Sequence, residues 1–274
     1  MKRIIVFILV FIFASSFAYA EEYANMSLDE LETFRDTLVD ELALVNAAIA
    51  SKKNESIVQA DVVNEAKIKD LFPDEDFALY IRDELGKMSI NDVVTQDELD
   101  SITRVHATYD GNIVDLTGIS HLRNLSSLSI TPYKATSISN ELLNLPYLKS
   151  LDLSYFNGTE LPDWLTQMVQ LEYLWFPGSS LVTLPDDIGA LVNLKNIMLN
   201  NSTDLISIPE SIGQCTALEE LHLGNTGIST IPDSLGNCAN LKNLEVGYTS
   251  ISELPQSVLD LGIEKIDISH TNIK

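Results

Sequence analysis

Residues 148–153, LKSLDL, recur along the chain at nearly constant spacing. The copies are ITRVHA at 102–107, LSSLSI at 125–130, LEYLWF at 171–176, LKNIML at 194–199, LEELHL at 218–223, LKNLEV at 241–246 and IEKIDI at 263–268. Eight units of 22–24 residues therefore tile 102–274. A fixed period of this length is typical of a solenoid, in which stacked units share one hydrophobic core.

A second motif keeps the same phase as the first. It is a leucine or isoleucine followed by proline, in LPDWL at 161, LPDDI at 184, IPESI at 208, IPDSL at 231 and LPQSV at 254. Proline is tolerated where a short helical turn begins, because that backbone N–H needs no partner. An acid after the proline suits the positive end of such a turn, and four units have one: Asp163, Asp186, Glu210 and Asp233. We interpret these acids as local structure on the convex side.

The combined pattern resembles the leucine-rich repeat family over about two-thirds of the chain. The resemblance implies an α/β horseshoe with a parallel sheet on its concave face. The family usually has Asn or Cys at the ninth position, where this chain has Ser179, Ser202, Thr226, Thr249 and Thr271. A hydroxyl can still bond buried backbone groups, with less reach. The extra residue of the 24-residue unit falls in NNSTD at 200–204, where we expect a bulge in the turn.

Strand alternation sends the first, fourth and sixth residues of each unit into the core, and the third, fifth, seventh and eighth out of the sheet. This places Trp175 on the exposed face, where an outward tryptophan is unexpected unless it binds something or covers its neighbours. We favour binding, with a protein ligand expected and a glycan also open. The candidate ligand-binding residues are Asp152, Tyr155, Tyr173, Trp175, Asn196, Met198, Asn200, His222, Glu245 and Tyr248.

Residues 1–20, MKRIIVFILVFIFASSFAYA, have the form of a signal peptide. Two basic residues precede an apolar run, and Ala18-Tyr19-Ala20 resembles a signal-peptidase site. A retained anchor is disfavoured because the run from Ile4 to Phe13 is shorter than the ~20 residues that a membrane span needs. We expect an exported protein that is secreted, periplasmic or at the cell surface.

Residues 21–71 form an acidic region with an expected amphipathic helix. Ser27 and Glu30 make a capping box at its start. Its apolar positions advance by 3.6 residues, as in a straight helix: Leu31, Phe34, Leu38, Leu42, Val45 and Ile49. The partner of this helix is the following segment, another copy of the chain or an envelope surface, and packing within the chain is favoured.

Residues 72–101 contain two further short helical patterns and lead directly into the first repeat. The matching features are the Phe72-Pro73-Asp74 start, the Leu85-Gly86 pair and the TQDEL segment at 95–99. They resemble the N-terminal cap of internalin-type bacterial leucine-rich repeat proteins, a small helical module that covers the first coil. The resemblance implies a bacterial surface setting and, for some members of the family, recognition of another organism's surface proteins.

Charge and cysteine placement exclude some classes of function. The chain carries 17 basic and 40 acidic residues, a net charge of −23, so nucleic acid is not an expected partner. Cys215 and Cys238 hold the same core place in consecutive units. An exported protein with two cysteines invites a disulfide. However, stacked parallel side chains start farther apart than the ~3.8 Å Cβ separation of a disulfide, so we favour two buried thiols.

No motif for catalysis, phosphate binding or metal binding is present in the sequence. We interpret His222, expected beside Glu245, as a polar contact rather than an acid/base pair. No enzyme activity and no cofactor are predicted. The prediction is an exported, non-catalytic protein that recognises a protein or glycan ligand on its concave face. The alternative is a structural or self-associating envelope component that uses the N-terminal helix and an uncapped last repeat, with Ile266 and Ile268 beside its open edge.

Overall fold

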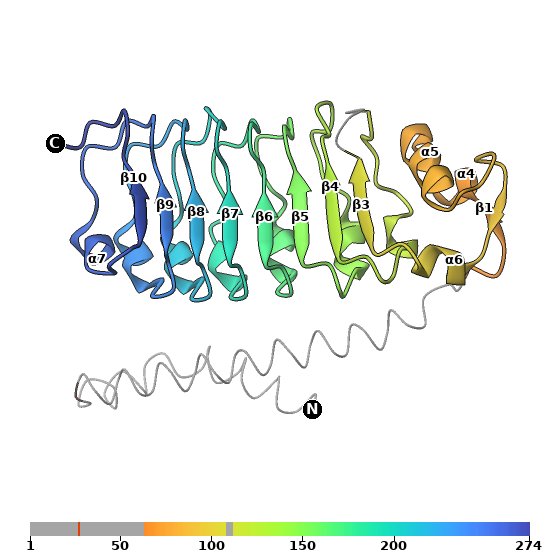
Figure 1. Ribbon diagram of the computed structural model, residues 1–274, viewed down its shortest axis with the longest axis horizontal. Helices are drawn as coiled ribbons and strands as arrows, with labels where there is room; N and C mark the ends of the chain where they lie inside the picture. Colours follow the sequence, from red (N-terminus) through yellow and green to blue (C-terminus); the bar gives the residue numbers. More distant parts are fainter. Residues whose placement is uncertain (1–26, 28–62, 108–111) are drawn as a thin grey trace, which may run out of the picture. The chain divides into compact units, whose positions relative to one another are not determined.

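The computed structural model describes Ser27 and residues 63–107 and 112–274 (Figure 1). The expected signal peptide at 1–20 and residues 21–62 of the expected acidic region, Ser27 apart, lie outside this description. Residues 63–107 and 112–274 belong to one compact unit, which contains the repeats and the segment in front of them.

Eight parallel strands form one sheet in strict chain order, one strand from each predicted repeat (Figure 1). The register is constant, since each residue pairs with the same position of the next unit, as Trp175 does with Met198. The sheet confirms the predicted α/β leucine-rich repeat solenoid. Its strands are β3 (Arg104–Ala107), β4 (Ser127–Ile130), β5 (Ser150–Leu153), β6 (Tyr173–Trp175), β7 (Asn196–Met198), β8 (Glu220–His222), β9 (Asn243–Glu245) and β10 (Lys265–Asp267).

Each strand from β3 to β9 is followed by a return segment with one short helical turn. Proline stands just before the turn in four units, with backbone angles of φ −65° and ψ 149° in Pro209. The fixed φ of proline limits where the turn can begin. Acids occupy the first turn as expected at Asp163, Glu210 and Asp233. The turns are η1 (Ile119–His121), η2 (Asn140–Asn144), η3 (Asp163–Gln167), η4 (Ile188–Ala190), η5 (Glu210–Gln214), η6 (Asp233–Asn237) and α7 (Gln256–Leu259).

The core follows the predicted alternation. In the fourth unit Leu171, Leu174 and Phe176 are fully buried, while Tyr173 and Trp175 between them are half-buried. In the last unit the equivalent apolar residues are partly accessible, and Ile268 is 41% exposed. The repeated aliphatic side chains therefore form one continuous core that runs the length of the solenoid.

Cys215 and Cys238 are free and fully buried, as predicted. Their thiols face the carbonyl oxygens of Ile188 and Ile212 at 3.6 and 3.3 Å. Burial raises the pKa of the Cys215 thiol to about 12 and that of Cys238 to about 11. Both side chains are therefore protonated at neutral pH and act as small core residues.

The ninth-position hydroxyls satisfy buried backbone groups. Ser202 Oγ donates to the carbonyl of Phe176 at 3.0 Å and accepts from the amide of Ser179 at 3.1 Å, so it joins two coils. Thr226 Oγ1 donates to Leu223 O in its own coil at 2.7 Å. The 24-residue unit, 194–217, has its extra residue in the turn after the strand, where the amide of Leu205 donates to the carbonyl of Ser202 at 3.1 Å.

The second positions form a ladder of opposite charges along the strand starts. Glu172 lies 2.7 Å from both Lys149 and Lys195, and Glu219 lies 2.7 Å from Lys242. Hydrogen bonds from Lys149 and Lys195 lower the pKa of Glu172. The alternation of sign from one coil to the next is consistent only with the observed register.

In front of the repeats lies the cap (Figure 1), built from β1 (Ala66–Lys67), α4 (Ile68–Leu71), α5 (Glu75–Glu84), β2 (Val93–Val94) and α6 (Gln96–Asp100). Strands β1 and β2 pair antiparallel. Ile68 is fully buried, and the rings of Phe72 and Phe77 pack edge to face at 5.1 Å. The packed cap thus includes residues 63–71, which the sequence analysis grouped with the preceding acidic region.

Polar side chains join the cap to the first coil. Asp74 Oδ1 accepts from the amide of Phe77 at 2.9 Å and caps α5, while its Oδ2 accepts from the amides of Val114 and Asp115 at 3.0 and 3.1 Å. Arg123 forms an ion pair with Asp100 at the end of α6. One carboxylate therefore both starts a helix and holds a loop 40 residues away.

Asp74→Ala is expected to lower the free energy of unfolding by about 1–3 kcal/mol, because it removes a helix cap and leaves two further amides without their acceptor. Urea titration followed by circular dichroism measures the change. The control is Asp83→Ala, which removes an exposed surface ion pair with Arg82. Equal stability of the two variants would contradict the role assigned to Asp74.

Ser202→Ala is expected to cost about 1–3 kcal/mol of stability, since it leaves a buried amide and a buried carbonyl of the adjacent coil unpaired. Thr226→Val keeps the side-chain shape and removes a bond within one coil, so its cost is expected to be smaller. Thermal and urea unfolding of the two variants provide the comparison. A larger loss for Thr226→Val would show that Ser202 does not join the coils.

Candidate binding site on the parallel sheet

The exposed face of the sheet consists of two columns of side chains. Register pairs each member with its counterpart in the next coil, so neighbours in a column stand ~4.8 Å apart. The third-position column is Arg104, Ser127, Ser150, Tyr173, Asn196, Glu220, Asn243 and Lys265. The fifth-position column is His106, Ser129, Asp152, Trp175, Met198, His222, Glu245 and Asp267.

Two aromatic rings lie on β6 in the middle of this face. Tyr173 and Trp175 contact each other edge to face, with ring centroids 5.8 Å apart, and both are half-buried. Trp175 Nε1 donates to Asn196 Oδ1 on the next strand at 2.6 Å. The indole is therefore held in one orientation while part of its ring stays accessible. This is the aromatic patch that the sequence predicts.

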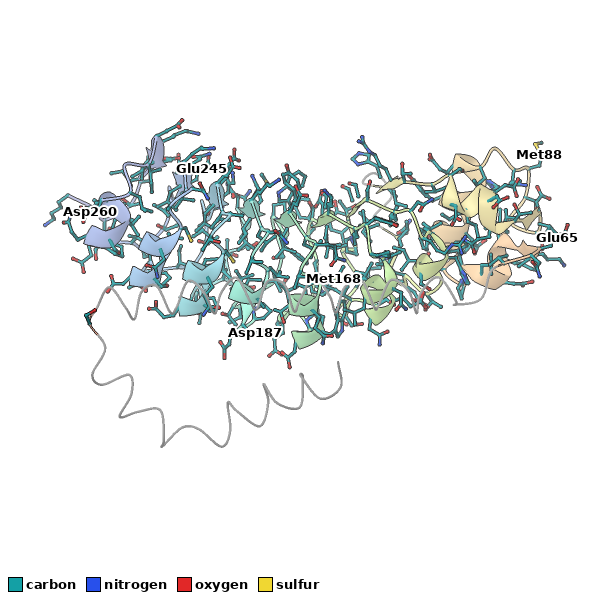
Figure 2. All side chains as sticks on the ribbon, turned by 90° about the horizontal axis from the view of Figure 1, so that it is seen from below. Glu65, Met88, Met168, Asp187, Glu245 and Asp260 are labelled. Atoms are coloured by element: carbon teal, nitrogen blue, oxygen red, sulfur yellow. The ribbon has the colours of Figure 1, made fainter. Side chains whose placement is uncertain are left out.

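A chain of hydrogen bonds continues from Asn196 across the following strands. Asn196 Nδ2 donates to Glu220 Oε2 at 2.7 Å. The ring of His222 lies between two carboxylates, with Nε2 3.0 Å from Glu220 and Nδ1 2.8 Å from Glu245. Lys265 Nζ donates to the second oxygen of Glu245 at 3.1 Å. Five strands, β6 to β10, are thus linked by side chains on the exposed face. Glu245, one of these side chains, is labelled in Figure 2.

Two of the expected ligand contacts are themselves buried. Asn196 is 8% exposed and His222 is 7% exposed. Their polar atoms are taken up by Trp175, Glu220 and Glu245. They therefore position their neighbours, and the accessible part of the site lies in the aromatic rings and carboxylates around them.

Tyr155 and Tyr248 stand at the end of the strands and not on the sheet itself. Both have left-handed backbones, with φ of 61° and 60°, and are 51% and 60% exposed. Tyr155 packs on Tyr133 at 5.2 Å, and Tyr248 stacks on His270 at 4.2 Å. The eighth position is a turn residue throughout this part of the chain, as Gly178 with φ 66° also shows. The assignment of these tyrosines to the sheet face is corrected accordingly.

The remaining predicted residues flank the aromatic pair. Asp152 accepts from Ser129 Oγ at 2.8 Å and from Ser154 Oγ at 2.6 Å. Met198 lies directly beside Trp175 on β7 and is half-buried. Asn200 Nδ2 donates to Glu245 Oε2 at 3.4 Å, and the side-chain oxygen Oδ1 of Asn200 is buried without a hydrogen-bond partner. Tyr133 is an exposed aromatic residue near the site that the sequence analysis did not include. It is the ninth residue of its unit, a position that is buried in the third to seventh units, so the repeat pattern did not indicate exposure.

The C-terminal half of the face is acidic. Glu220, Glu245 and Asp267 lie on three consecutive strands. Hydrogen bonding from His222, assisted by Lys265 and Asn200, lowers the pKa of Glu245 to about 2 despite partial burial. Hydrogen bonds from Ser269 lower the pKa of Asp267. Glu245 and Asp267 are therefore ionised at neutral pH, and the surface favours a ligand with positive charge.

Within residues 63–107 and 112–274, no group of three or more His, Cys, Asp or Glu side chains is arranged to hold a metal ion. The described helices are all too short or too polar to cross a membrane. The geometry of the sheet therefore offers contact surface, with a rigid aromatic centre and an acidic flank.

Two segments match known protein families. Residues 56–100 match the family described as "Bacterial adhesion/invasion protein N terminal", and residues 217–238 match the family described as "Leucine Rich Repeat". The first match spans the cap and the second spans most of one coil. A stretch of 121 residues is 31% identical to the adenylate cyclase of Schizosaccharomyces pombe, and it covers 44% of this chain and 7% of that enzyme.

Solved structures share the fold. A leucine-rich repeat protein of Leptospira interrogans aligns with a TM-score of 0.59 at 25% identity, over 65% of this chain and 46% of that protein. Internalin C2 of Listeria monocytogenes aligns with a TM-score of 0.52 at 23% identity, over 78% of this chain and 98% of that one. This chain spans less than half of the Leptospira protein and a small part of the cyclase.

The fold and the matched segments together define a leucine-rich repeat protein. More specifically, the chain resembles bacterial leucine-rich repeat proteins of the internalin type, with an internalin-like N-terminal cap in front of its repeats.

Glu245→Gln is expected to lower stability at pH 7 by about 1–2 kcal/mol, because a charge-assisted bond to His222 is replaced by a neutral one. The folded-state pKa is lowered from 4.5 to about 2, so the stabilisation is complete above pH ~4.5 and is lost as the pH falls toward 2. Urea unfolding at several pH values measures the gap between variant and parent. The difference in unfolding free energy between parent and variant is expected to become smaller as the pH falls from about 4.5 toward 2. The control is Glu253→Gln, at an exposed glutamate in the same unit, and a gap independent of pH would contradict the assignment.

Proposed function

We propose that this chain is an exported, non-catalytic binding protein that recognises a protein ligand on the exposed face of its parallel sheet, centred on Tyr173 and Trp175. The observation that carries the proposal is the bond from Trp175 Nε1 to Asn196 Oδ1 at 2.6 Å, which holds a half-exposed indole in one orientation. A large aromatic group held before binding loses little entropy when a partner covers it.

Tryptophan and tyrosine dominate the binding energy of many protein interfaces, especially near the centre of the contact surface. Here the two rings lie on β6, with three strands on one side in the sheet and four on the other. Met198 beside them supplies an adaptable apolar contact. The arrangement supports a protein contact with an apolar centre and a polar rim.

Charge supports a basic partner surface. Asp152 lies on one side of the aromatic pair and Glu220, Glu245 and Asp267 on the other, within a chain of net charge −23. Opposite charge on the ligand would speed association and orient the complex, with an effect that weakens as salt increases. The aromatic rings could also stack on a sugar, so a glycan ligand is the other outcome that a binding experiment can return.

Export is the remaining part of the proposal. It is supported by the signal-peptide form of residues 1–20 and by the match of residues 56–100 to bacterial adhesion and invasion proteins. We place the protein in the periplasm, at the cell surface or outside the cell. A non-catalytic role is supported by His222, whose two ring nitrogens are both bonded to carboxylates on the sheet.

Tyr173→Ser combined with Trp175→Ser is expected to weaken ligand binding about a hundredfold or more, since both central contacts are lost. The ligand is first captured from cell-surface extracts with the parent protein, and its affinity for each variant is then measured directly. Tyr173→Ser alone keeps the bond between Trp175 and Asn196. Its affinity is measured as well, so that the site can still be tested if the double variant does not fold.

Trp164→Ser is the matched control, because Trp164 is the chain's other tryptophan, also half-buried, and lies in η3 on the return segment. It is expected to bind as the parent does. Unchanged binding by a folded double variant would overturn the proposed site, and capture of a polysaccharide alone would replace the protein ligand by a glycan.

A further inference from the structure

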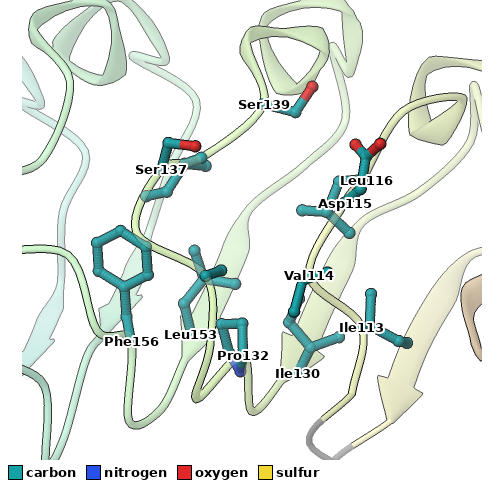
Figure 3. Close-up of a pocket in the computed structure, with 12 residues that line it drawn as sticks. Ile113, Val114, Asp115, Leu116, Ile130, Pro132, Ser137, Ser139, Leu153 and Phe156 are labelled. Atoms are coloured by element: carbon teal, nitrogen blue, oxygen red, sulfur yellow. The ribbon is translucent and has the colours of Figure 1, made fainter. Parts of the chain in front are cut away.

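A hollow lies away from the sheet face, between the first coils on the side of the strand ends (Figure 3). It has a volume of about 370 Å³ and is partly open to solvent. Its walls come from the loop of the first unit, the end of β4 with the loop that follows it, and the end of β5 with its loop. The large apolar side chains of the lining include Ile113, Leu116, Ile130, Ile138, Leu153 and Phe156. This size is in the range of pockets that hold a ligand group.

The hollow exists because one core position is filled by a small residue. The eleventh position of a unit, or its equivalent, is a fully buried large aliphatic residue at Leu181, Leu205, Ile228 and Ile251. In the second unit the same position is Ala135, which lines the pocket. The third unit has Gly158 there, but the ring of Phe156 takes the space, as an added Cβ on Gly158 would lie 2.4 Å from it.

No aromatic ring from the second unit compensates for Ala135 as Phe156 does for Gly158. Tyr133, at the ninth position, is 51% exposed and packs on the equally exposed Tyr155. These tyrosines are the chain neighbours of Pro132 and Phe156, which both line the pocket. A hollow with mostly apolar lining residues, together with Asp115, Ser137 and Ser139, thus adjoins a pair of accessible aromatic side chains. This arrangement suits an anchor site in a protein interface.

The charge around the hollow is negative. Among the residues that line it, Asp115 alone is charged, and Asp74 holds the amides of Val114 and Asp115 at 3.0 and 3.1 Å. Lys134 lies in the second loop but does not line the pocket. A partner segment that enters here meets the carboxylate of Asp115, so basic residues beside its anchor would be favoured.

We propose that this pocket receives one aromatic or branched apolar side chain from a basic segment of a protein partner, flanked by Tyr133 and Tyr155. The site is distinct from the aromatic centre on β6, and its occupation does not depend on the function proposed for that face. The pocket supplies burial for the anchor, and Asp115 supplies the charge that selects the residues beside it.

The probe for the test is a short peptide, blocked at both ends, with one tryptophan between two pairs of lysines. Isotope-labelled methyl groups report where it binds: Ile130 and Leu153 for the pocket, and Met198 for the sheet face. The peptide is expected to shift the pocket methyls in the parent protein. Its counterpart with alanine in place of tryptophan is expected to leave them unchanged.

Ala135→Leu restores the residue type of the other coils and fills the hollow. It is expected to weaken peptide binding about tenfold to a hundredfold, because the tryptophan of the peptide can no longer be buried. That factor corresponds to the free energy of burying one large apolar side chain. Ala239→Leu adds the same side chain at an exposed alanine of the sixth unit and is expected to bind as the parent does. Asp115→Asn keeps an oxygen for the amide of Thr117 at 2.9 Å and removes the charge, so it is expected to reduce binding severalfold at low salt.

Equal binding by Ala135→Leu and the parent protein would overturn the proposal, as would shifts confined to Met198. If Ala135→Leu does not fold, the proposal is tested by Asp115→Asn and by the alanine peptide. Unchanged binding by Asp115→Asn together with pocket shifts from the alanine peptide would overturn it. Equal binding of a peptide with glutamates in place of lysines would overturn the basic character of the partner.

Discussion

The structure depends on one constraint, the in-register stacking of eight short parallel strands in which each residue pairs with the same position of the next coil. A strand of three or four residues has little stability alone, and its apolar face is covered only when the next unit stacks on it. Register therefore decides the core and the surface together. It aligns the aliphatic positions into one continuous core and aligns the third and fifth positions into two exposed columns.

Because register is fixed, residues about 23 positions apart become neighbours, and their chemistry can be read in pairs. Lys149 and Lys195 flank Glu172 at the strand starts, and Glu245 lies between His222 and Lys265 on the exposed face. Pairs of this kind contribute little individually at an exposed surface. Their effect here is mainly geometric, since a connected set of bonds from Trp175 to Lys265 restrains side chains that would otherwise be mobile. The sheet thus presents a rigid surface, which lowers the entropy lost on binding.

Repetition explains which features were predictable from the sequence. The strands, the buried thiols of Cys215 and Cys238 and the bonding of Ser202 all follow from position in the repeat, because every unit has the same backbone. Other features depend on local backbone angles or on the choice of rotamer. The left-handed φ of Tyr155 moves it from the sheet to the strand end, and the bonds of His222 to carboxylates on both sides bury it. The inclusion of Ile68 in the cap depends on packing between non-repeating segments, for which the period carries no information.

The two proposed binding regions differ in what they cost the fold. Residues in the exposed columns can change without altering the packing of the core. An aromatic pair such as Tyr173 and Trp175 therefore leaves the core residues of its unit unchanged. Ala135 is different, because it stands where other coils have a fully buried leucine or isoleucine. Truncating such a residue to alanine in a packed core costs ~2–5 kcal/mol when the space stays empty. The loss of this packing at one coil, beside two exposed tyrosines, agrees with the binding role proposed for the open space. A small residue at a core position therefore carries a stability cost that a change of one polar residue on the surface does not.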